Sequence, residues 1–126
     1  MLIPLFSLRG DGWGLGEIPD LVPFAAWARA AGFGVAQILP VLEVSGGQSS
    51  PYAAQTAFAL DPVYLALDRI EGARRPDDLA DLAKLPRVDW GAVRWRKTQA
   101  LEAAFARLGD LPEEARAWAA GETDWL

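Results

Sequence analysis

The chain has 126 residues with a formal net charge of −5 at pH 7, and 52% of its residues are hydrophobic. This length and composition can supply one domain with a core, so a disordered chain is excluded. The acidic balance argues against nucleic acid and anionic membranes as partners, because both attract basic surfaces. No apolar run approaches the ~18–20 residues that span a bilayer.

The sequence contains neither cysteine nor histidine. Disulfides, thiolate or imidazole zinc sites, cysteine nucleophiles and Ser-His-Asp triads are therefore excluded within these 126 residues. Any chemistry would have to use carboxylates, lysine or tyrosine. The apolar start lacks the basic leader and the cleavage site of a signal peptide. The absence of cysteine permits a reducing cytoplasm, and a cytoplasmic location is our expectation.

The first 41 residues predict one βαβ unit. Apolar runs at residues 3–7 and 35–41 predict two strands, and an apolar period over residues 21–31 predicts the helix between them. Asp20 is the expected N-cap, and Gly32 is expected to end the helix. The two strands should be parallel.

A glycine-rich loop, residues 10–16, follows the first predicted strand. It could cradle a phosphate, but the G-x-G-x-x-G spacing is absent and no Lys-Ser/Thr follows, so nucleotide binding is disfavoured. Trp13 in this loop is the tryptophan expected to be exposed. The tryptophans on predicted helices are expected in the core: Trp90, Trp95 and Trp118.

Residues 35–67 organise the rest of the chain. The strand at 35–41 should be buried on both faces, so its polar Gln37 should have hydrogen-bond partners. A polar loop rich in Ser, Gly and Pro follows it and contains Tyr52. Because α/β proteins place sites on loops at the carboxyl ends of their strands, this loop is the candidate site.

The second half of the chain is predicted to be helical. A short helix is expected at residues 78–84 and a long one at 90–108, with Asp89 as its N-cap and Gly109 at its end. The long helix carries one apolar face that includes the stem of Lys97. Pro112 opens a last helix, residues 113–120.

Two parallel strands do not close a core, because parallel sheets are normally covered on both faces. The last residues, Thr123 to Leu126, have no partner element in view. We therefore interpret the chain as the front of a longer α/β polypeptide, incomplete as it stands. Its predicted parts are residues 1–70, two βα units with the Tyr52 loop, and residues 71–126, a helical insertion.

Four motifs occur in a specific order: Gln37-Ile38-Leu39-Pro40, Ser50-Pro51-Tyr52, Thr56-Ala57-Phe58-Ala59 and Asp61-Pro62. In this order they resemble the amino-terminal part of the 4-alpha-glucanotransferases, also called amylomaltases or disproportionating enzymes. The resemblance extends with gaps from Leu2 to Leu126. Departures at Ala36, Ala53 and Leu60 affect details of the sugar contacts.

The resemblance implies the start of a (β/α)₈ TIM barrel that transfers alpha-1,4-glucan segments between oligosaccharides without a cofactor. It also implies a retaining mechanism with two carboxyl groups ~5–5.5 Å apart. In the family these catalytic carboxylates lie far downstream, so no catalytic residue is expected here and the isolated 126 residues should be inactive.

The candidate substrate-binding residues are Tyr52, Ser50, Ser49 and Asp61. A tyrosine ring can stack on the apolar C–H face of a sugar, although a tyrosine can also simply anchor its own loop. The serines could bond sugar hydroxyls or cap turns, and Asp61 could line the pocket or, as we favour, accept backbone N–H bonds. The alternative function is a non-catalytic carbohydrate-binding or helical interaction module.

Overall fold

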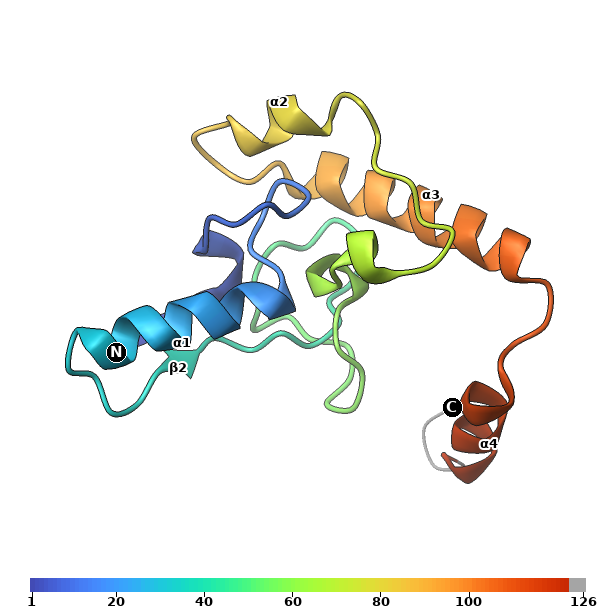
Figure 1. The fold of residues 1–126 in the computed structure, drawn as a ribbon, viewed down its shortest axis with the longest axis horizontal. Helices are drawn as coiled ribbons and strands as arrows, with labels where there is room; N and C mark the ends of the chain where they lie inside the picture. Colours follow the sequence, from blue (N-terminus) through green and yellow to red (C-terminus); the bar gives the residue numbers. More distant parts are fainter. Residues whose placement is uncertain (123–126) are drawn as a thin grey trace.

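The computed structural model describes residues 1–122, with Leu79 and Ala80 described by their backbone alone. Residues 123–126, which were expected to lack a partner, lie outside the described part. Helices and short strands alternate at the start of the chain, and the second half is helical (Figure 1). The described chain is thus of mixed α/β composition, as predicted.

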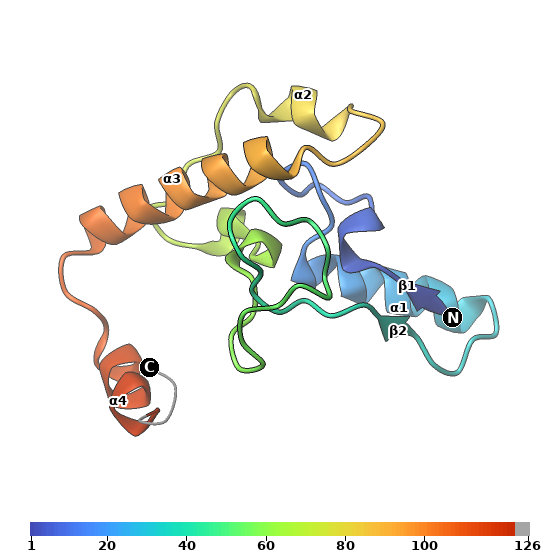
Figure 2. The ribbon, with the colours of Figure 1, turned by 180° about the vertical axis from the view of Figure 1, so that it is seen from behind.

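The predicted βαβ unit is present but its strands are short. β1 (Leu2–Ile3) and β2 (Gln37–Ile38) are parallel neighbours, with Leu2 opposite Gln37, and α1 (Leu21–Ala30) connects them. Figure 2 shows the strand pair with α1 on one side of it. The expected first strand ends early because the chain turns after Pro4 into a 3-10 turn, η1 (Leu5–Ser7).

The prediction that the second strand is buried on both faces is wrong in this structure. Val35 is 74% exposed, and Gln37, expected to be buried with bonded partners, is also exposed. The reason is that β2 pairs only with β1 among residues 1–122, so its other edge has no neighbouring strand. Parallel strands become buried only when further strands and helices cover them.

Gly32 ends α1 as predicted. It has φ 87° and donates its N–H to Arg29 O at 3.0 Å, while Phe33 N donates to Ala28 O at 2.9 Å. This pair of bonds is the Schellman arrangement, which favours glycine. Asp20 does precede α1, but its carboxylate accepts from Glu17 N at 2.7 Å and caps the preceding 3-10 turn, η2 (Ile18–Asp20), instead of α1.

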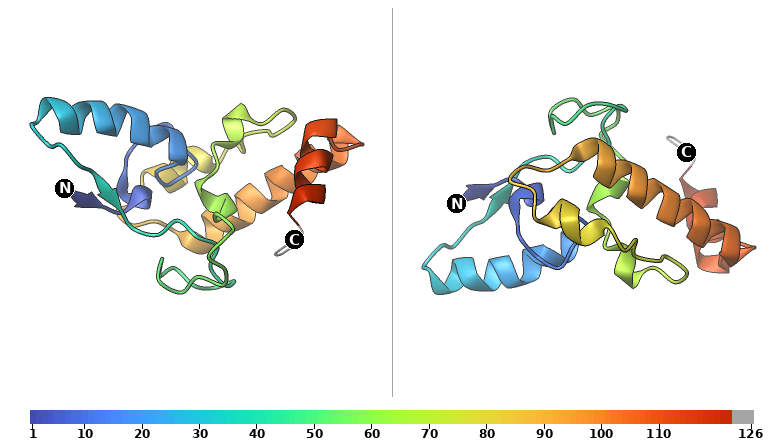
Figure 3. Two further views of the ribbon diagram at one scale, coloured as in Figure 1. Left: turned by 90° about the horizontal axis from the view of Figure 1, so that it is seen from below. Right: turned by 90° about the horizontal axis from the view of Figure 1, so that it is seen from above.

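The long predicted helix has the predicted bounds. α3 (Trp90–Leu108) begins after Asp89, whose carboxylate accepts from Ala92 N at 2.9 Å, and ends before Gly109. The shorter helices are α2 (Leu79–Ala83) and α4 (Glu113–Gly121). Figure 3 shows α3 crossing the molecule, with α4 following at its far end.

The core lies against α3 and not against the strand pair. Two further 3-10 turns, η3 (Pro62–Tyr64) and η4 (Leu67–Arg69), pack on α3 together with residues of the glycine-rich loop. The loop approaches α3 closely at Gly14, where φ is 85° and a Cβ would lie 2.9 Å from Val93 Cγ2. A side chain there would separate the loop from the helix.

The tryptophans are placed differently from the prediction. Trp13, expected to be exposed, is 0% exposed and belongs to the core, where it packs with Leu67 and Ala100. Trp95 and Trp118, expected in the core, are both exposed, and Trp90 is half-buried. Trp95 was expected in the core only because it is a tryptophan on a helix, whereas the buried face of α3 is the one that carries Val93 and Lys97.

Candidate functional site

The two arms of the polar loop that follows β2 are held together by backbone contacts. They meet in isolated antiparallel bridges, Leu42 with Leu60 and Val44 with Ala54. Asp61 N donates to Val41 O at 2.9 Å and closes the base. The candidate residues 49–52 thus lie on a loop whose ends are held together by the backbone.

Three of the four candidate residues are neighbours on this loop and are exposed. Tyr52 is 72% exposed, and Ser49 and Ser50 are exposed beside it. A turn sets the position of Tyr52: Ala53 N donates to Ser50 O at 3.0 Å, and Tyr52 N donates to Ser50 Oγ at 3.4 Å. The Ser50 hydroxyl can still donate to a ligand because it acts there as an acceptor.

Tyr52 also borders a groove of about 490 Å³ at the strand pair. The other lining residues come from β1, β2 and the segment that follows β2: Leu2, Gln37, Ile38, Leu39, Pro40, Val41 and Leu42. The loop that carries Tyr52 leaves the carboxyl end of β2, the end at which α/β proteins bind their ligands, and the groove beside the ring runs along the strand pair.

Asp61 lies apart from the other candidates, at the base of the loop. It is 2% exposed, and its carboxylate forms a two-pronged ion pair with Arg94 of α3, with both N–O distances 2.8 Å. Its Oδ1 also accepts from Val63 N at 3.0 Å. In this structure the carboxylate therefore fixes the base of the loop to α3, and a contact between Asp61 and a sugar stays a prediction.

Tyr64 packs next to this ion pair. Burial raises the pKa of the Tyr64 phenol to about 12, and the nearby Asp61 carboxylate adds to the shift. Tyrosinate formation in the folded chain is therefore disfavoured. The stability linked to Tyr64 is fully present below pH ~10, the ordinary tyrosine pKa, and is lost as the pH rises toward the folded value.

We expect the Tyr52→Phe chain to show this shift directly, because the sequence contains only two tyrosines and Tyr64 would be the remaining one. Ultraviolet absorbance should show tyrosinate forming near pH 12, or together with cooperative unfolding if that comes first. A reversible titration near pH ~10, with circular dichroism unchanged, would contradict the burial of this phenol.

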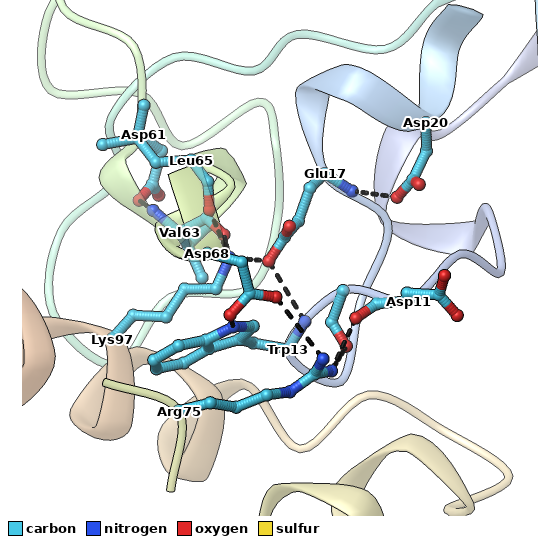
Figure 4. Close-up of polar contacts among 11 residues, drawn as sticks. Asp11, Trp13, Glu17, Asp20, Asp61, Val63, Leu65, Asp68, Arg75 and Lys97 are labelled. Atoms are coloured by element: carbon cyan, nitrogen blue, oxygen red, sulfur yellow. Dashed lines mark hydrogen bonds and ion pairs between the residues drawn. The ribbon is translucent and has the colours of Figure 1, made fainter. Parts of the chain in front are cut away.

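Behind the loop, Lys97 of α3 is buried in a polar network (Figure 4). Its ammonium group donates to Glu17 Oε1 at 2.6 Å, to Val63 O at 2.6 Å and to Leu65 O at 2.8 Å. An ammonium group has three N–H donors, so all of them are used. Burial lowers the pKa of Lys97, and the bond to Glu17 opposes that shift.

The network extends from Glu17 to the glycine-rich loop. Trp13 N donates to Glu17 Oε1 at 3.1 Å, and the Trp13 indole donates to Asp68 Oδ1 at 3.0 Å. Arg75 binds Asp68 and the carbonyl oxygens of Asp11 and Gly12 (Figure 4). Because the Lys97 ammonium group and both N–H groups of Trp13 have acceptors within residues 1–122, this cluster joins segments that are far apart in the sequence.

Sequence reasoning missed most of this network. Glu17, Arg94 and Arg75 are not among the residues that the sequence pattern singles out. The one available signal was Lys97 on an otherwise apolar helix face, because a buried lysine requires a partner of opposite charge.

Comparison with known proteins agrees with the motif order of the loop. The sequence profile described as 4-alpha-glucanotransferase matches residues 3–126. The chain belongs to the 4-alpha-glucanotransferase family. It is 35% identical over 123 residues to a 4-alpha-glucanotransferase of Chlamydia caviae, an alignment that covers 89% of this chain and 23% of that protein.

Two further relatives show the same relation. A 4-alpha-glucanotransferase of Synechocystis is 32% identical over 124 residues, which cover 90% of this chain and 24% of the relative. The rice 4-alpha-glucanotransferase DPE2 is 36% identical over 84 residues, an alignment that covers 63% of this chain and 9% of the rice protein. The chain thus spans less than a quarter of the length of these curated 4-alpha-glucanotransferases.

Two structural features are absent from residues 1–122 of this family member. None of the helices within residues 1–122 is both long and apolar enough to cross a membrane. No group of three or more His, Cys, Asp or Glu side chains in the same part of the chain is arranged to hold a metal ion.

Proposed function

We propose that the protein to which these 126 residues belong is a 4-alpha-glucanotransferase that moves alpha-1,4-glucan segments between oligosaccharides. Its retaining carboxylates would lie outside this chain, so the isolated chain is inactive. Glucan oligosaccharides as partners and a cytoplasmic location belong to the same proposal. Family membership supports the activity, and the placement of Tyr52 supports the contribution of this chain to it.

The same proposal assigns residues 1–70 to the first two βα units of a (β/α)₈ barrel and residues 71–126 to a helical insertion. The parallel β1–α1–β2 unit supports the barrel start. The open edge of β2 then becomes the place for further strands of the barrel. α3 packs on η3 and η4, so the insertion shares a core with the barrel segment.

The observation that carries the proposal is the exposed Tyr52 ring on the loop that follows β2, bordering a groove at the strand pair. Stacking on such a ring suits a neutral sugar, because the ring meets the C–H face of the pyranose while the hydroxyls remain available for hydrogen bonds. Ser50 and Ser49, both exposed next to Tyr52, would bind those hydroxyls. Asp61 would support the site from the base of the loop through Arg94 and Val63.

Replacing Tyr52 with alanine in the full-length protein should weaken the use of maltotriose. An aromatic contact of this kind contributes about 0.5–1.5 kcal/mol, so KM should rise roughly 2- to 12-fold. Tyr52→Phe keeps the ring and should stay within about twofold of the parent. The measurement is glucose release from maltotriose at varied substrate concentration.

Phe33→Ala is the matched control, because Phe33 is an exposed aromatic residue that precedes β2 at the opposite end of the strand. Its KM should equal that of the parent. Equal KM values for Tyr52→Ala and Phe33→Ala would remove the sugar-binding role of the loop. A parent protein that releases no glucose would refute the transferase activity itself.

A further inference from the structure

A cavity of about 500 Å³ lies between the glycine-rich loop and the turn that enters α3. It shares no lining residue with the groove beside Tyr52. Its walls come from two stretches that are far apart in the sequence, within residues 6–15 and 83–90. This volume falls within the range of small-molecule sites, and the proposed glucan loop does not use it.

The charge of this cavity is opposite to that of the chain as a whole. Among the described residues, its charged lining residues are Arg9 and Arg87, although the chain carries a net charge of −5. The acidic residues near Arg87 in sequence are engaged elsewhere: Asp81 pairs with Lys84, and Asp89 caps α3. An anion entering the cavity would therefore meet arginines and no lining carboxylate.

Both arginines have guanidinium N–H groups that are not used in hydrogen bonds within the described residues. Arg9 donates one N–H to Ala83 O at 3.0 Å, which places its guanidinium between the two walls. Arg87 has no hydrogen-bond or ion-pair partner among residues 1–122. A guanidinium presents five N–H donors in a planar fork that matches the oxygens of a phosphate group.

An aromatic pair forms another part of the wall. Phe6 and Trp90 both line the cavity and are half-buried, with their rings 5.1 Å apart in an edge-to-face arrangement. Such a surface suits the C–H face of a sugar ring. Cationic and aromatic groups in one cavity together indicate a ligand that has an anionic group and an apolar face.

We propose that this cavity binds a small phosphorylated sugar, with the phosphate held by Arg9 and Arg87 and the ring against Trp90. A neutral glucan carries no anionic group that could pair with the Arg9 and Arg87 guanidinium groups, so this site goes beyond the proposed transferase function. The loop that carries Arg9 leaves the carboxyl end of β1, and the Tyr52 loop leaves the same end of the parallel partner β2. The ligand would therefore bind at the same end of the strand pair from which the Tyr52 loop leaves.

Calorimetric titration of the full-length protein with glucose 6-phosphate, inorganic phosphate and glucose tests this proposal. Glucose 6-phosphate should bind at least ~10-fold more tightly than inorganic phosphate, and glucose should bind more weakly still. Arg87→Gln should weaken the binding of glucose 6-phosphate roughly 10-fold or more, because charge-assisted hydrogen bonds are lost. Folding should be unchanged in this variant, since Arg87 has no side-chain partner within residues 1–122 to lose.

Arg29→Gln is the control, because Arg29 is an exposed arginine on α1 that likewise lacks a side-chain partner in the described residues and does not line the cavity. Equal affinities of the Arg87→Gln and Arg29→Gln proteins for glucose 6-phosphate would overturn the proposal. So would the absence of glucose 6-phosphate binding, or affinities for inorganic phosphate and glucose 6-phosphate that are the same. The Tyr52→Ala protein should bind glucose 6-phosphate with the affinity of the parent. The test of the phosphate site therefore gives an answer even if the proposed role of Tyr52 in glucan binding is wrong.

Discussion

Replacing Lys97 with methionine should lower the free energy of unfolding by about 3–5 kcal/mol, the cost of removing one partner of a buried ion pair. The reason is that Glu17, itself buried, would lose its ion-pair partner, and Val63 O and Leu65 O would lose their donor. Urea denaturation of the 126-residue chain, followed by circular dichroism, measures this loss. Since whole domains are stable by only about 5–15 kcal/mol, an unfolded variant is within the expected outcome.

Two comparisons separate the ion pair from the side chain itself. Glu17→Gln combined with Lys97→Met removes both charges and should recover a substantial part of the stability, because no unpaired buried charge remains. Lys84→Met removes the other lysine, which is exposed and pairs only with Asp81, and should cost less than about 1 kcal/mol. A Lys97→Met chain within about 1 kcal/mol of the parent would contradict the buried network.

The ion pair between Asp61 and Arg94 should show an asymmetric response. Arg94→Ala leaves the carboxylate of Asp61 buried, with Val63 N as its remaining donor among residues 1–122, so about 3 kcal/mol of stability should be lost. Asp61→Ala leaves a guanidinium that is 24% exposed and can still reach water, so about 1–2 kcal/mol should be lost. Urea denaturation of both single variants measures the difference.

Arg96 offers a matched control on the same helix. It forms an ion pair with Asp78, whose side chain is more than half exposed, so Arg96→Ala leaves a carboxylate that water can reach and should cost less than Arg94→Ala. If Arg94→Ala costs no more than Arg96→Ala, the base of the Tyr52 loop does not depend on α3. In that case limited proteolysis would also cut residues 42–60 equally in both variants.

The features that the sequence predicted well are those specified by local interactions. Asp89 and Gly109 mark the ends of α3 because a cap and a left-handed glycine act within a few residues. Gly32 does the same for α1. The parallel pairing of β1 with β2 follows from a short strand, a helix and a second strand in sequence.

The features that it predicted poorly depend on segments far apart in the chain. Trp13 is buried because η4 and α3 cover it, and nothing in its glycine-rich surroundings encodes that contact. The partner of Lys97 lies 80 residues away at Glu17. The exposure of β2 likewise depends on strands that would pair with its free edge, and not on its own apolar residues.

The position of a bound glucan tests the central claim most directly. A crystal structure of the full-length protein with a maltooligosaccharide should show a glucose ring stacked on the Tyr52 ring, about 4 Å from it, with a sugar hydroxyl bonded to Ser50 or Ser49. An oligosaccharide bound elsewhere, with the Tyr52 ring free of sugar, would contradict the assignment of this loop to the glucan site.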